Sequence, residues 1–106
     1  MPALDSPPDF LAIKASYKVS LKEDLGRLEG LHSEVDFDFA EPRTFEELRL
    51  LAHVQAGNAA TFGFGALGEA ARAVDVHLSD AESPSTLLPS LVTAWRAQLQ
   101  IACQSY

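Results

Sequence analysis

One histidine in the middle of the chain has surroundings that suit a reactive side chain. On a helical wheel of residues 45–62, His53 lies about 140° from the centre of the apolar stripe, so its imidazole is expected to face solvent. The stripe consists of Phe45, Leu48, Ala52, Gln55, Ala59 and Phe62, at the spacing of a helix face that packs on a core. A neutral imidazole has one unprotonated ring nitrogen, and that nitrogen can act as a nucleophile.

The positions next to His53 on the same helix carry little side chain. Ala56, Gly57 and Ala60 follow at i+3, i+4 and i+7, and Arg49 precedes at i−4. A glycine inside a helix costs about 1 kcal/mol relative to alanine, and no packing requirement of the core explains Gly57. This clearing would let an acidic group of another protein approach the ring. The alternative is that His53 is an incidental residue on a structural bundle.

The apolar periodicity predicts an all-α protein. Helices are expected over residues 9–30, 45–61, 66–78 and 85–104, after a flexible N-terminal arm over residues 1–8. Short connections between three of these helices imply antiparallel neighbours, and hence an antiparallel up-down-up-down four-helix bundle over residues 9–106.

Local signals indicate where these helices begin and which residues they bury. Thr44 and Glu47 have the spacing of a capping box, which predicts a helix start at Phe45. Phe37 and Phe39 are expected to cover one end of the core. The expected core positions of the first and third helices are Ile13, Tyr17, Leu21, Leu25, Leu28, Leu67, Ala70, Ala71, Val74 and Leu78. Gln55 lies within the apolar stripe of the second helix, so its amide needs a buried partner.

The residues around His53 resemble the signature of the histidine-containing phosphotransfer (HPt) family. The run is Ala52-His53-Val54-Gln55-Ala56-Gly57-Asn58-Ala59-Ala60-Thr61-Phe62-Gly63. It has a histidine, a glycine four residues later, a small residue at six, and a Phe-Gly pair at the helix end. The likeness extends over residues 45–78, and the family usually has an acidic or amide residue at the position of Asp75. The first helix is similar in length and apolar spacing, and the last in length.

The resemblance implies a carrier in a two-component phosphorelay. A phospho-aspartate on a response-regulator receiver domain, including the receivers of hybrid histidine kinases, would donate a phosphoryl group to His53, and another receiver would then take it. The receiver would supply Mg²⁺, so this chain is expected to bind no cofactor and to have no ATP-dependent kinase activity of its own. Asp75 would orient His53 by accepting a hydrogen bond from the N–H of its inner nitrogen, unless Asp75 is a solvated surface acid.

The chain departs from the family pattern at two positions. Gln55 stands where leucine or isoleucine is usual, and Ala56 stands where lysine is frequent. Without that lysine, Arg49 or Arg72 would have to balance the phosphoryl charge. The alternative function is therefore a non-phosphorylated, HPt-like helical adaptor that binds receivers or other signalling proteins. In either case the expected docking face consists of Leu50, Val54, Ala56, Gly57, Ala60 and Thr61.

Composition excludes several other classes of protein. A length of 106 residues predicts one domain, and a net charge of −7 argues against nucleic acid as a partner. No apolar run approaches the length of a membrane span, and the N-terminus lacks the features of a signal peptide. The three histidines lack the spacing of a metal site, and Cys103 cannot form an internal disulfide. We therefore expect a cytoplasmic monomer without bound metal.

Overall fold

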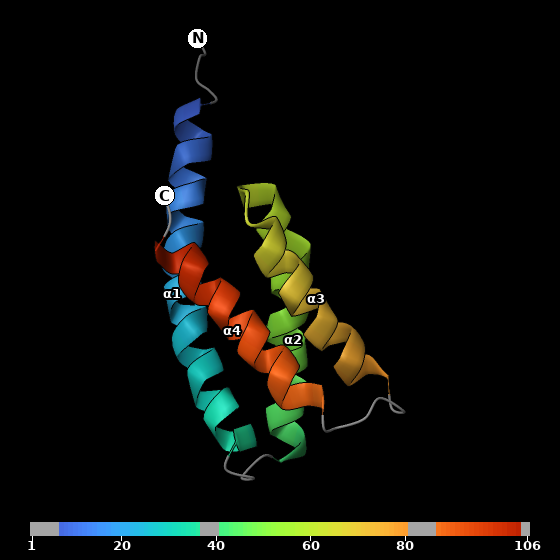
Figure 1. The fold of residues 1–106 in the computed structure, drawn as a ribbon. Coiled ribbons are helices and arrows are strands. Elements are labelled where there is room, and N and C mark those ends of the chain that lie inside the picture. The colour runs from blue at the N-terminus through green and yellow to red at the C-terminus, as the bar shows by residue number, and fades with distance from the viewer. Residues whose placement is uncertain (1–6, 37–40, 81–86, 105–106) are drawn as a thin grey trace.

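Four α-helices make up most of the chain that the structure describes, residues 7–36, 41–80 and 87–104 of a computed structural model (Figure 1). They are α1 (Pro7–Asp36), α2 (Pro42–Asn58), α3 (Gly65–Ser79) and α4 (Leu88–Gln104), and a 3₁₀ turn over Ala59–Phe62 extends α2. No strand occurs within the described ranges. The expected all-α four-helix bundle is therefore confirmed.

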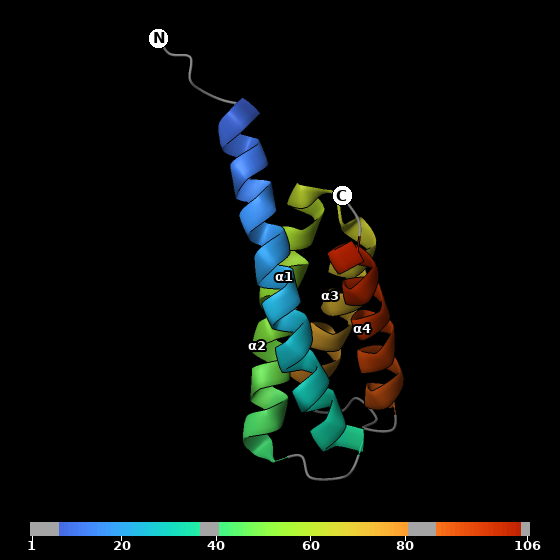
Figure 2. The same cartoon turned by 90° about the vertical axis from the view of Figure 1, so that its left-hand side faces the viewer.

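Each helix packs against two neighbours around the bundle. α1 contacts α2 and α4, and α3 contacts the same two helices from the other side. In Figure 2 the chain runs down α1, up α2, down α3 and up α4. The N-terminal part of α1 projects past the other helices in both views (Figures 1 and 2). No helix within the described ranges has both the length and the apolar character that a membrane span requires.

The core forms where the apolar faces of all four helices meet. Its buried residues include Leu21 and Leu28 of α1, Leu48 and Ala52 of α2, Leu67, Ala71 and Val74 of α3, and Val92, Trp95 and Leu99 of α4. Full burial of a side chain the size of leucine stabilises a fold by about 1.5–3 kcal/mol. The core positions expected on the third helix are therefore largely correct. Leu67, Ala71 and Val74 are buried, and Ala70 and Leu78 are partly buried against this cluster.

Two residues that were expected in the core are exposed. Ile13 of α1 is 55% exposed. Phe45 is 36% exposed, and Thr44 beside it is fully buried instead. In the first turn of α2, Thr44 and not Phe45 therefore faces the bundle. The Thr44 hydroxyl donates a hydrogen bond to Glu34 Oε1 of α1 at 2.6 Å.

The expected capping box at the start of α2 is wrong. The helix begins at Pro42, with Glu41 as the preceding cap residue. The Thr44 hydroxyl accepts a hydrogen bond from the Glu41 N–H at 3.1 Å, so Thr44 lies inside the first turn. Proline suits the first helical position because its ring sets a helical φ and its missing N–H would have no partner there. Proline therefore moves the helix start ahead of the capping-box pattern.

The first helix is longer than its sequence pattern predicts at both ends. It begins at Pro7 rather than after Asp9, and it continues past Gly30 to Asp36. Leu31 and His32 are buried beyond that glycine, so packing against the bundle outweighs the low helix propensity of Gly30. Phe37 and Phe39, the start of the helix expected over residues 85–104, and most of the expected arm lie outside the described residues.

The turn between α2 and α3 depends on Gly63, and a second glycine follows in the first turn of α3. Gly63 ends the 3₁₀ turn with φ 88°, a left-handed conformation that glycine adopts without steric cost. Gly68 is buried, and a Cβ at this position would lie 3.5 Å from the Ala59 Cβ. The α2 helix ends at Asn58, before the expected Thr61, because the chain tightens into the 3₁₀ turn. Gly68 therefore lies against the end of α2, where an added Cβ would make an ordinary van der Waals contact.

Candidate functional site

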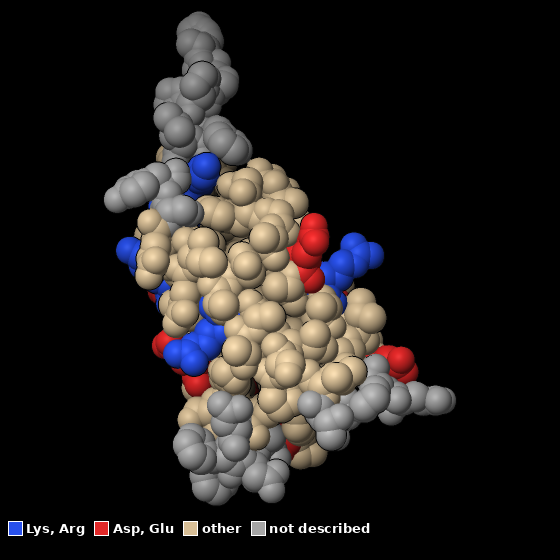
Figure 3. Space-filling view, in the orientation of Figure 1, with Lys and Arg blue, Asp and Glu red and all other residues tan. Residues whose placement is uncertain are grey.

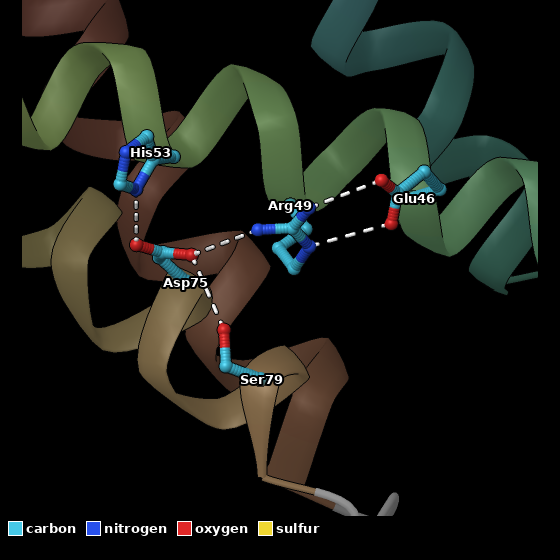
Figure 4. Close-up of polar contacts among 5 residues, drawn as sticks. All are labelled: Glu46, Arg49, His53, Asp75 and Ser79. Atoms are coloured by element: carbon cyan, nitrogen blue, oxygen red, sulfur yellow. Dashed lines mark hydrogen bonds and ion pairs between the residues drawn. The ribbon is translucent and has the colours of Figure 1, made fainter.

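His53 projects from α2 toward solvent and contacts an acidic residue of α3. Its side chain is 69% exposed, as the wheel predicts, and its Nδ1 lies 2.9 Å from Asp75 Oδ2 (Figure 4). Asp75 is 17% exposed, so the carboxylate lies partly between the two helices. The close packing of α3 on α2 brings together two residues that are 22 positions apart in the chain.

This contact selects one tautomer of the neutral imidazole. A carboxylate can only accept hydrogen bonds, so Nδ1 must carry the proton that it donates to Asp75. Nε2 is then the unprotonated nitrogen. Figure 4 shows this second nitrogen on the side of the ring away from Asp75 and Arg49. In its neutral form the imidazole, whose side chain is 69% exposed, therefore presents an unprotonated ring nitrogen with an available lone pair.

A hollow of about 310 Å³ lies directly beside the ring. It is lined by His53, Ala56, Gly57, Arg72, Asp75 and Val76, and so spans α2 and α3. Gly57 is exposed, and a Cβ added there would meet no atom within 4 Å. Neither backbone conformation nor packing requires glycine at this position, because its φ is not positive. The space beside His53 is therefore also open in the folded structure. The unfavourable helix propensity of Gly57 has no structural explanation.

The two arginines expected near the phosphoryl group have different surroundings. Arg49 Nε and Nη2 donate to the two carboxylate oxygens of Glu46 at 3.3 and 3.0 Å, and its Nη1 lies 3.9 Å from Asp75 Oδ1. The hydrogen bonds and charge of Arg49 lower the pKa of Glu46, and the same contacts raise the pKa of Arg49. Arg72 is exposed at the edge of the hollow, and no contact joins it to another charged group of the described chain.

The expected docking residues surround His53 on α2 and in the following turn. Leu50 and Val54 are exposed on the α1 side, beside a second hollow of about 270 Å³ between α1 and α2. Ala60 and Thr61 are exposed, and Ala56 is partly buried. These side chains leave the imidazole accessible from the solvent side of α2.

Sequence reasoning missed two residues of α3 that belong to this site. Val76 is exposed and lines the hollow beside His53, and the Ser79 hydroxyl lies 3.5 Å from Asp75 Oδ1. Ser79 follows Asp75 at i+4, so a helical wheel of α3 would have placed it on the same face as Asp75, whereas Val76 at i+1 carries no such signal.

Gln55 has the buried partners that its place in the apolar stripe requires. Its Oε1 accepts from Trp95 Nε1 at 2.7 Å, and its Nε2 donates to Asp24 Oδ2 at 3.0 Å. This network ties α2 to α4 and α1 on the face opposite His53. It explains how a glutamine lies within an apolar stripe without leaving a buried polar group unpaired.

The face formed by α3 and α4 has few charged side chains near its middle (Figure 3). Within the described ranges, no three His, Cys, Asp or Glu residues are close enough together to hold a metal ion.

Comparisons with protein-family models, with curated proteins and with solved structures find no match to this chain.

Proposed function

We propose that this protein is a histidine phosphotransfer protein, which accepts a phosphoryl group on His53 from a phospho-aspartate receiver domain and passes it to another receiver. The observation that supports this proposal most strongly is the His53–Asp75 pair. Its Nδ1···Oδ2 distance of 2.9 Å leaves Nε2 free, on a ring that is 69% exposed beside an unobstructed glycine.

The proposed step needs no base on this protein. The Nε2 lone pair attacks the phosphorus in line, the N–P bond forms as the P–O bond to the receiver's aspartate breaks, and the electron pair leaves with the aspartate carboxylate. Nε2 has no proton to lose, so the phosphorylated ring becomes cationic. Asp75 stabilises that positive charge through the Nδ1 hydrogen bond. Transfer onward is the same reaction in reverse, with a second receiver's aspartate as the nucleophile.

Charge compensation comes from both partners in this proposal. A Mg²⁺ ion bound by the receiver would supply positive charge toward the phosphoryl oxygens, the compensation that phosphoryl transfer generally requires. Arg72 is the cation of this chain that lines the hollow without a carboxylate partner in the described residues. It is therefore the residue best placed to meet the phosphoryl group where the family often has lysine.

The experiment is a transfer assay with a phosphorylated receiver domain. Wild type should acquire phosphate that is labile in acid and stable in base, as expected of a phosphohistidine. His53→Gln should fold normally by circular dichroism, because the ring is exposed, and should acquire none. Phosphorylation of His53→Gln at the wild-type level would refute the assignment of the nucleophile.

The second candidate is an adaptor that binds receivers without accepting phosphate. Ala56 supports it, because this position offers no cation beside the imidazole. Titration of the protein with phosphorylated and unphosphorylated receivers separates the two functions. An adaptor would form a stable complex and remain unphosphorylated throughout.

A further inference from the structure

The Asp75 carboxylate uses its two oxygens for different partners (Figure 4). Oδ2 faces His53 Nδ1 at 2.9 Å. Oδ1 faces Ser79 Oγ at 3.5 Å and Arg49 Nη1 at 3.9 Å. A carboxylate that is held at one oxygen cannot rotate freely about its χ2 angle. The contacts at Oδ1 therefore keep Oδ2 turned toward the imidazole.

Arg49 is itself oriented by a second carboxylate. Glu46 lies one turn earlier on α2 and accepts from Nε and Nη2 at 3.3 and 3.0 Å, a two-point contact that fixes the plane of the guanidinium. The remaining terminal nitrogen, Nη1, is the one that faces Asp75. In Figure 4, Arg49 lies on the Nδ1 side of the imidazole, with Asp75 between them. Arg49 is thus directed at Asp75 and away from the nitrogen that would carry the phosphoryl group.

We propose that Arg49 is a positioning residue that acts through Asp75, with Glu46 as its anchor, and that it is not a ligand of the phosphoryl group. The sequence of contacts is Glu46, Arg49, Asp75, His53, and it runs from α2 to α3 and back to α2. Together these contacts favour the tautomer of His53 that carries its proton on Nδ1. The effect on transfer rests on the proposed function, whereas the effect on the tautomer does not.

The first test measures the tautomer of His53 in the unphosphorylated protein. ¹⁵N chemical shifts of the neutral ring report the ratio of Nδ1–H to Nε2–H forms. Arg49→Gln and Glu46→Gln should each lower that ratio about twofold to fivefold, the range of a partly exposed ion pair. Arg43→Gln is the matched control, because Arg43 is exposed on the same helix and pairs only with Glu41, at 3.8 Å, in the described residues. An Arg49→Gln protein with the wild-type tautomer ratio would overturn the proposal.

The second test measures transfer in two backgrounds. Arg49→Gln should slow phosphotransfer about twofold to fivefold in the wild-type background, and it should have no further effect in Asp75→Ala, because the residue it acts through is gone. Arg72→Gln should slow transfer equally in both backgrounds and leave the tautomer unchanged. If Arg49→Gln slows Asp75→Ala as strongly as wild type, Arg49 contacts the phosphoryl group and the proposal is wrong.

The two tests also separate this proposal from the proposed function. A wild-type protein that accepts no phosphate would refute the phosphotransfer function, and the ¹⁵N measurement would still decide the role of Arg49. A protein that transfers normally while Arg49→Gln keeps the wild-type tautomer would retain the function and lose this inference.

Discussion

Gly57 allows the clearing beside His53 to be tested without disturbing the fold. It stands near the end of α2, it is exposed, and an added Cβ would meet nothing within 4 Å. Replacing it with glutamine should therefore stabilise the helix, because glycine is the poorer helix former. We expect about 0.5 kcal/mol, which corresponds to an increase in Tm of about 2–3 °C for a domain of this size.

The same substitution should impair phosphotransfer. A glutamine at Gly57 projects from the helix one turn after His53, into the space that a receiver must occupy to reach Nε2. We expect transfer to slow about tenfold or more, which corresponds to at least about 1.4 kcal/mol of lost transition-state stabilisation. The assay is single-turnover transfer from an excess of phosphorylated receiver, with thermal unfolding measured on the same samples.

Gly26→Gln is the matched control for this prediction. Gly26 is also exposed on a helix, and an added Cβ there also meets nothing within 4 Å. This variant should gain similar stability and transfer phosphate at the wild-type rate. If Gly57→Gln and Gly26→Gln transfer equally fast, the clearing has no part in docking and the reasoning from small residues is refuted.

Three further predictions concern the structure that supports the site. Gln55→Leu should lower the free energy of unfolding by about 1–3 kcal/mol in urea denaturation, because it leaves the Trp95 Nε1–H buried without its acceptor. Adding Trp95→Phe should recover part of this loss. A Gln55→Leu variant more stable than wild type would contradict the role of this hydrogen-bond network. Gly63→Ala should cost about 1–2 kcal/mol by the same measurement, since φ is 88° and only backbone strain opposes the methyl group. Burial raises the pKa of the Cys103 thiol, so less thiolate is present at a given pH. Iodoacetamide should therefore alkylate Cys103 more slowly in the folded protein than in denaturant. Equal alkylation rates would contradict this prediction.

Local sequence patterns were sufficient to predict the helices and the direction in which His53 points. Leu48, Ala52 and Gln55 recur at helical spacing, and the structure buries them while exposing His53 on the opposite face. This agreement follows from the geometry of a single helix, because residues three and four apart share a face whatever lies opposite. The requirement of Gln55 for a partner was evident from the same wheel, and the identity of that partner was not.

Tertiary structure decided where the helices end and which polar groups meet. Thr44 is fully buried and hydrogen-bonded to Glu34 of α1, whereas Ile13 is exposed although it shares the apolar spacing of the α1 core residues; neither follows from local spacing. The placement of Arg49 between Glu46 and Asp75 likewise depends on how closely α3 lies on α2. A helical pattern states which side chains share a face, whereas contacts across 22 or 40 residues exist only when the packing of the whole bundle sets the distance between helices.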